Sequence, residues 1–263
     1  MDEPYLSQFR ALIADHAASR DVHDQPDGRG FASDHGTASD AFVAREVGRV
    51  AVHQRSLVPL LAPVGHAANI LDFGCGTGGT TLAIALAKQF KAEHVIGVDA
   101  NPRAIAAARV RATSYHGDKP TLSFQPTIPG EPLPFVRNSF DLVTSVSVLE
   151  FITDHDGRAK VIADLQRVVR PGGYVFIATP RPWFREYHSR RWLGDFDREP
   201  GFPWSSSTRE LRAWFAGWQE ISLEVPLAAI AATRAPWAKP LLGATRSLLP
   251  HVTRWQKRLF RKP

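Results

Sequence analysis

The stretch that decides the fold spans residues 69–79 and reads Asn69-Ile70-Leu71-Asp72-Phe73-Gly74-Cys75-Gly76-Thr77-Gly78-Gly79. Its apolar start predicts a buried strand, its glycine cluster predicts a tight turn, and residues 80–90 predict a helix. Glycine tolerates positive φ angles and lets backbone N–H groups approach a ligand closely. The stretch is therefore predicted to be a nucleotide-binding strand–turn–helix.

The glycine spacing alone does not identify the nucleotide. Gly74, Gly76 and Gly79 fit the dinucleotide pattern G-x-G-x-x-G, and Gly74, Gly76 and Gly78 fit G-x-G-x-G equally well. Asp72 favours a cationic ligand, because a carboxylate before the turn opposes a pyrophosphate at a helix N-terminus. S-adenosylmethionine (SAM) carries a sulfonium and an ammonium and no phosphate, so it suits this site. The alternative is that Asp72 is buried and holds its own loop through hydrogen bonds.

An alternating pattern of strands and helices follows the glycine turn. Four further apolar runs predict strands at residues 94–99, 121–125, 140–146 and 174–179. This alternation is typical of a parallel sheet. Asp99 ends the second strand, where an acidic side chain can accept hydrogen bonds from both hydroxyls of a ribose. Asp99 could also cap the following helix, and the two roles are compatible.

Four segments, in this order and spacing, resemble those of class I SAM-dependent methyltransferases. They are the stretch 69–79, then Leu133-Pro134-Phe135 with Asn138-Ser139-Phe140-Asp141, then Ser145-Val146-Ser147-Val148-Leu149-Glu150, and finally Val169-Arg170-Pro171-Gly172-Gly173. The resemblance covers residues 69–180 and implies a Rossmann-like fold with SAM as cofactor. Many relatives carry a histidine after the glutamate of the third segment. Phe151 stands there in this chain, so no catalytic histidine is carried over.

The resemblance implies ten cofactor-binding positions. They are Asp72, Gly74, Cys75, Gly76, Gly78, Asp99, Ala100, Thr127, Ile128 and Ser145. Relatives often place an aspartate after the third strand to bind the adenine amine, but residues 125–130 contain no acid. We therefore expect backbone groups or the Thr127 hydroxyl to supply that contact, and Ile128 to pack on the ring. No metal site is expected, because neither a cysteine nor a clear carboxylate spacing accompanies His23 and His35.

The region after Pro180 is expected to select the substrate. Residues 179–204 show no helical or strand period, which predicts a long insertion at the edge where α/β sheets bind ligands. Glu186 and His188 lie two positions apart, so in an extended loop they share a face and could converge on one acceptor. Histidine titrates near neutral pH, which suits a general base. An equally weighted alternative is that the pair only holds the loop together.

Positive charge is concentrated at the end of the chain. The net charge is +6, yet no acidic residue follows Glu224. A nucleic-acid partner is therefore not expected, because the basic residues do not surround the predicted cleft. Residues 234–263 are interpreted as a basic amphipathic tail that is dispensable for SAM binding. The tail either packs on the body or contacts an anionic membrane surface.

The chain lacks the features of a secreted or membrane-spanning protein. It has a single cysteine, no apolar run long enough to cross a bilayer, and no basic and apolar leader at its N-terminus. The expected location is the cytoplasm, with peripheral membrane contact as a variant.

These features predict an α/β fold with a Rossmann-like sheet of seven mostly parallel strands and helices on both faces. Closing antiparallel strands are expected at residues 219–225 and 227–233. Three parts are expected along the chain: an N-terminal helical cap and lid loop (1–65), a SAM-binding domain (66–233) with a substrate insertion (180–206), and the basic tail (234–263).

The predicted function is transfer of a methyl group from SAM to a small-molecule acceptor, at a hydroxyl oxygen. N-methylation, or methylation of a lipid or glycan intermediate at a membrane surface, is the alternative within the same class. Two other classes stay open. A nicotinamide-dependent oxidoreductase would fit G-x-G-x-x-G and Asp99, but no Tyr-x-x-x-Lys site is recognisable. A non-catalytic protein with the same fold would keep the glycines and Asp99 without turnover.

Overall fold

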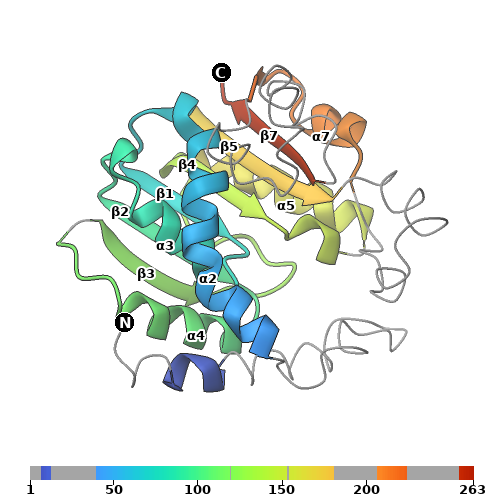
Figure 1. Ribbon diagram of the computed structural model, residues 1–263. Coiled ribbons are helices and arrows are strands. Elements are labelled where there is room, and N and C mark those ends of the chain that lie inside the picture. The colour runs from blue at the N-terminus through green and yellow to red at the C-terminus, as the bar shows by residue number, and fades with distance from the viewer. Residues whose placement is uncertain (1–6, 13–39, 119, 153, 181–205, 224–254) are drawn as a thin grey trace, which may run out of the picture.

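The computed structural model describes residues 7–12, 40–118, 120–152, 154–180, 206–223 and 255–263. These residues form one seven-stranded sheet in the order β3-β2-β1-β4-β5-β7-β6 (Figure 1). The strands are β1 (Asn69–Phe73), β2 (His94–Asp99), β3 (Thr121–Pro126), β4 (Phe140–Val146), β5 (Val169–Pro180), β6 (Gln219–Ile221) and β7 (Trp255–Arg261). Strands β1 to β5 pair in parallel, and β7 is antiparallel to both of its neighbours. The predicted Rossmann-like, mostly parallel sheet is confirmed.

Helices connect the strands. They are α2 (Asp40–Ser56), the 3-10 helix η1 (Val58–Val64), α3 (Gly79–Ala85), the 3-10 helix η2 (Lys88–Phe90), α4 (Pro102–Ala112), the 3-10 helix η3 (Leu149–Phe151), α5 (His155–Val168) and α7 (Thr208–Trp214). Residues 7–12 are also helical. Helix α2 does not continue into η1 as one α-helix, because Pro59 and Pro63 lack the N–H donors that an α-helix needs.

Alternate side chains of the central strands enter two separate hydrophobic layers. Ile70, Leu142 and Phe176 are fully buried in the layer that contains residues of η1 and α3. Leu71 and Val143 point the other way and are fully buried with residues of α5 and α7. Burial on both faces explains why these strands read as continuous apolar runs in the sequence. The loops of the site leave the ends of these buried strands.

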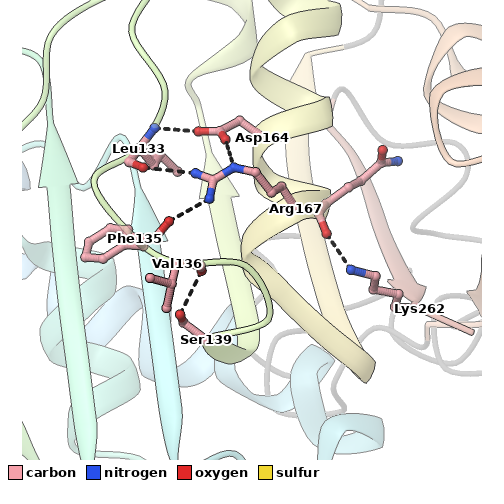
Figure 2. A network of polar contacts seen from close by, with 8 residues as sticks. Leu133, Phe135, Val136, Ser139, Asp164, Arg167 and Lys262 are labelled. Carbon is pink, nitrogen blue, oxygen red and sulfur yellow. Dashed lines mark hydrogen bonds and ion pairs between the residues drawn. The ribbon is translucent and has the colours of Figure 1, made fainter.

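The chain that enters β4 is held by polar contacts to α5 (Figure 2). The guanidinium of Arg167 donates to the carbonyl oxygens of Phe135 (2.6 Å) and Leu133 (2.9 Å). Asp164 accepts from Arg167 Nε at 2.5 Å and from the backbone N–H of Leu133 at 2.6 Å. One of the segments that resembles the methyltransferases is therefore a loop whose backbone is anchored before β4 begins.

The last strand corrects the predicted tail. Residues 255–261 form β7, which lies between β5 and β6 in the sheet. Leu259 and Phe260 are 0% and 2% exposed. Treating the whole of 234–263 as a tail outside the methyltransferase domain was therefore wrong for residues 255–261. That the tail is dispensable for SAM binding stays a prediction. The predicted strand at 227–233 lies outside the described residues.

Basic residues at the end of the chain make contacts within the body. Arg258 is 4% exposed and donates to Glu220 Oε1 of β6 at 2.5 Å. Lys262 Nζ donates to the carbonyl oxygens of Gln166 (2.8 Å) and Val169 (2.7 Å), and the position of Lys262 near α5 is visible in Figure 2. A membrane role for the basic residues would therefore depend on residues 234–254, which lie outside the described part of the chain. In the described part, no helix is long and apolar enough to cross a membrane.

If β7 is a core strand, Phe260→Ala should destabilise the protein strongly. The Phe260 ring stacks on Phe215, with ring centroids 4.2 Å apart and planes 2° from parallel. Removing a buried phenylalanine leaves a cavity and costs about 3–5 kcal/mol. Urea unfolding should show this loss of unfolding free energy.

The matched control is Val136→Ala, because the Val136 side chain is 78% exposed. Its effect should stay within about 0.5 kcal/mol, as for most surface substitutions. Equal effects of the two substitutions would show that β7 contributes nothing to the core.

Candidate functional site

The candidate site lies at the carboxyl ends of β1 and β4. These strands are neighbours, although the chain passes through β2 and β3 between them. Open α/β sheets bind ligands at such a switch point, because the loops that leave the two strands diverge there. The glycine turn, residues 74–79, leaves β1 at this place. Its Gly74 lies so close to the segment after β4 that an added Cβ would be 2.1 Å from Val148 Cγ2.

The conformation of the glycine turn requires glycine. Gly74, Gly76 and Gly78 have φ angles of 70°, 52° and 78°, which side-chain-bearing residues rarely adopt. A Cβ on Gly78 would be 2.9 Å from the ring of Phe124. Gly76 differs, because no described atom lies within 4 Å of where its Cβ would be. The turn is closely packed on its inner side and open at Gly76, where a ligand can approach the backbone.

Asp99 faces the same turn from the end of β2. Its Oδ2 accepts a hydrogen bond from the Gly76 N–H at 2.8 Å, and its Oδ1 accepts one from the Asn101 N–H at 2.8 Å. The side chain of Asn101 caps α4, so Asp99 does not have the capping role that the sequence left open. A carboxylate has about four lone-pair positions, so both oxygens can still accept from a ligand. The structure thus brings Gly76 and Asp99 together, whereas their contact with a ligand stays a prediction.

Three further predicted residues form a rim beside Asp99. Ala100 is exposed, and the backbone N–H of Thr127 donates to the carbonyl oxygen of Asp99 at 3.0 Å. The Ile128 side chain is 62% exposed, which is unusual for a large apolar residue in this structure. An apolar surface next to a carboxylate offers one place for a flat ring and another for hydroxyl groups.

The side chain of Asp72 is buried beneath the surface of the site. Its side chain is 1% exposed, and its two carboxylate oxygens accept from the hydroxyls of Thr81 (2.6 Å) and Thr144 (2.8 Å). Burial raises the pKa of the Asp72 carboxyl from 3.8 to about 6, and the two hydrogen bonds oppose that rise. Asp72 thus joins β1 to α3 and β4 through hydrogen bonds, as the alternative from the sequence expected. Its contact with a ligand stays a prediction.

The side chains of Cys75 and Ser145 are buried as well. They are 7% and 1% exposed. Burial, followed by the charges of Asp99 and Asp72, raises the pKa of the Cys75 thiol well above its usual value, so the thiol stays protonated. Ser145 Oγ has no hydrogen-bond partner among the described residues. Any contribution of these two residues to ligand binding comes from their backbone.

Ser147 is a site residue that the sequence analysis did not single out. It follows β4 with a φ of 60°, and its N–H donates to the carbonyl oxygen of Ala178 at 2.9 Å. A non-glycine residue in the left-handed region costs about 1–3 kcal/mol, and such strain is often found at functional sites. The sequence does not indicate this left-handed backbone conformation, because serine is not typical of it. Ser147 immediately precedes Val148, which packs against Gly74.

The predicted catalytic pair is not part of the described structure. Glu186 and His188 fall in the gap between residues 180 and 206, so their position relative to the glycine turn is untested. Within the described ranges, no group of three or more His, Cys, Asp or Glu side chains could hold a metal ion.

Comparison with known proteins points to one kind of domain. Residues 70–173 match a family model described as a methyltransferase domain. The chain is 27% identical over 152 residues to the trans-aconitate 2-methyltransferase of Azoarcus sp. strain BH72, covering 57% of this chain and 52% of that protein. It is 33% identical over 110 residues to a ubiquinone biosynthesis O-methyltransferase of Aeromonas salmonicida, covering 42% of each. The chain thus spans about half the length of the curated relatives it matches.

A solved structure shares the fold. The N-methyltransferase NodS from Bradyrhizobium japonicum WM9 superposes with a TM-score of 0.51, covering 84% of this chain and 97% of that one. The sequence identity is 18%, so this likeness concerns the fold alone.

Asp72→Asn tests the buried carboxyl. Because its pKa is higher in the folded protein than in the unfolded chain, the folded state holds this proton more tightly. The resulting stabilisation is fully present below about pH 4 and is lost as the pH rises through about 6. Asparagine keeps the shape, and threonine hydroxyls can both donate and accept. Relative to wild type, the variant should gain up to roughly 3 kcal/mol between about pH 4 and pH 7.

Urea unfolding of both proteins across this pH range measures the effect. The dependence of unfolding free energy on urea concentration should be equal in the two proteins, so that the comparison reports stability alone. A difference between the proteins that does not change with pH would contradict the burial of a titrating Asp72.

Proposed function

We propose that this chain is a class I SAM-dependent methyltransferase, an enzyme that transfers a methyl group from SAM to a small-molecule acceptor. The match of residues 70–173 to a methyltransferase domain supports this proposal. The observation that carries the proposal is the glycine turn, open at Gly76 and bordered by the partly exposed carboxylate of Asp99. This combination suits a ligand with a ribose and no phosphate.

The residues at the site fit SAM. Asp99 would accept from the ribose hydroxyls, and the open backbone at Gly76 would border the methionine part. Ile128 would pack on the adenine ring, with backbone groups or the hydroxyl of Thr127 taking the place of the aspartate that many relatives carry. Asp72 would act only indirectly, by fixing the strand that leads into the turn.

The chemistry divides between cofactor and chain. When bound, SAM supplies a methyl group that its sulfonium already activates as an electrophile. The chain must hold the acceptor's lone pair in line with the methyl carbon and exclude water. A hydroxyl acceptor also has to lose its proton, and we assign that step to His188 as general base, with Glu186 orienting the imidazole. This assignment rests on the two-residue spacing in the sequence.

The acceptor is proposed to be a small molecule methylated at oxygen. One similar protein is named for trans-aconitate and another for O-methylation in ubiquinone biosynthesis, and both names support this substrate class. N-methylation is the alternative. Incubation with SAM and a panel of polycarboxylic acids, hydroxylated aromatic compounds and amines, with S-adenosylhomocysteine release as the readout, would distinguish them.

Asp99→Ala should weaken SAM binding by roughly 2–4 kcal/mol, because charge-assisted hydrogen bonds to the ribose are lost. Isothermal titration calorimetry measures this change. Asp118→Ala is the matched control, since it removes an exposed carboxylate outside the site. If folded Asp99→Ala binds SAM as wild type does, the ribose assignment is wrong. Binding of NADH in place of SAM by the wild-type protein would favour the oxidoreductase class instead.

His188→Ala should lower turnover by about 10²–10⁴-fold if His188 is the general base. The affinity for SAM should stay the same, because the residue acts on the acceptor. His116→Ala, at an exposed position, is the control for removing an imidazole. Turnover within a few-fold of wild type would assign His188 a structural role and leave proton removal to another group.

A further inference from the structure

Helix α2 reaches the glycine turn through a buried polar cluster, which we call the turn clamp and which consists of Glu46, Thr77 and Arg111. Thr77 Oγ1 donates to Glu46 Oε2 at 2.7 Å. Arg111 donates to the backbone carbonyl of Glu46 at 2.8 Å and to Thr77 Oγ1 at 3.2 Å. The three residues are 3%, 4% and 2% exposed. The clamp thus joins α2 and α4 to the middle of the turn.

Thr77 is the natural anchor of the glycine turn. Among residues 74–79, only Cys75 and Thr77 carry a side chain. The Cys75 thiol donates over a long distance, 3.6 Å, to the carbonyl oxygen of Gly76, which belongs to the turn itself. A turn composed mostly of glycine loses much conformational entropy when it is ordered. The backbone N–H groups of Gly74 and Cys75 donate to Val98, and that of Gly76 donates to Asp99. The hydroxyl of Thr77 adds a side-chain hydrogen bond from the turn to α2.

Further contacts press α2 against the same turn. Arg49 forms an ion pair with Glu46, and a Cβ on Gly79 would be 2.7 Å from Arg49 Cδ. On its other side, the guanidinium of Arg111 lies 4.5 Å from the ring centroid of Phe9. Figure 1 shows α2 lying across the sheet beside α3, the helix that begins with the turn's last residue. The N-terminal helices therefore form one packed unit with the turn.

The energetics of the turn clamp suggest that it fixes the conformation of the glycine turn. Burying charged groups is costly, and well-packed hydrophobic residues are often as stabilising as a buried ion pair. A hydrogen-bonded charged cluster favours one arrangement of its partners, because any other arrangement leaves a buried charge unsatisfied. In this protein the turn clamp therefore favours one conformation of the glycine turn.

We propose that Glu46 and Arg111 are positioning residues of the cofactor site. Through Thr77 they hold the backbone of residues 76–78 in the conformation that binds SAM. Helix α2 would thus contribute to the site although it lies outside the matched methyltransferase domain. This inference rests on the proposed function. Because coupling between two equilibria is reciprocal, SAM binding should in turn stabilise the docking of α2.

Calorimetry on Thr77 variants tests the clamp. Thr77→Val keeps the shape and removes the hydroxyl, and it should weaken SAM binding about tenfold or more. Thr77→Ser restores the hydroxyl and should bind within about threefold of wild type. Glu46→Leu removes both acceptor oxygens and should weaken binding in the same direction. Combining it with Thr77→Val should add little, since both changes remove the Thr77–Glu46 hydrogen bond. Thr113→Val, at an exposed hydroxyl just after α4, is the matched control and should bind normally.

Hydrogen exchange on the wild-type protein gives a second readout that does not depend on any variant. Addition of SAM should slow amide exchange in α2 and leave α7, on the opposite face, unchanged. Normal SAM affinity in folded Thr77→Val, or unchanged exchange in α2 on SAM binding, would overturn the inference while leaving the proposed function standing. Failure of the wild-type protein to bind SAM would instead overturn the proposed function.

Discussion

The lack of space for side chains at the glycine turn is the constraint on which the structure depends. Three neighbours press on it: Val148 after β4 at Gly74, Phe124 of β3 at Gly78, and Arg49 of α2 at Gly79. These contacts come from parts of the chain that are far apart in sequence, and they meet only because the sheet order brings β1 between β2 and β4. The one turn glycine left open, Gly76, is the one beside Asp99.

Buried carboxylates serve this arrangement at a cost to stability. The buried side chain of Asp72 joins β1 to α3 and β4 through hydrogen bonds. Burial raises the pKa of this carboxyl to about 6, because the charged form is poorly solvated there. Glu46 is buried in the same region but is paired with Arg49 and hydrogen-bonded to Thr77. Burying these two carboxylates reduces stability locally. Such costs are expected at functional sites, where the backbone geometry has to suit a ligand.

The described structure and the proposed chemistry concern different parts of the chain. The core carries the fold and the residues that suit SAM, whereas the proposed base and its partner belong to the stretch between residues 180 and 206. One fold can serve many reactions, because the residues that choose the acceptor vary independently of the scaffold. This is why the match of residues 70–173 to a methyltransferase domain bears on the cofactor more directly than on the acceptor.

Local patterns in the sequence were enough for the five parallel strands and the glycine turn, because turn chemistry and strand periodicity act over a few residues. They were not enough for β7, whose basic residues did not indicate a core strand. Arg258 becomes buried only because Glu220, 38 residues earlier, pairs with it. The burial of Asp72 and the strained φ of Ser147 were likewise decided by packing between distant segments. Sequence thus determined the local elements, and tertiary structure decided which charges are buried, because a partner distant in sequence has to be present to satisfy each one.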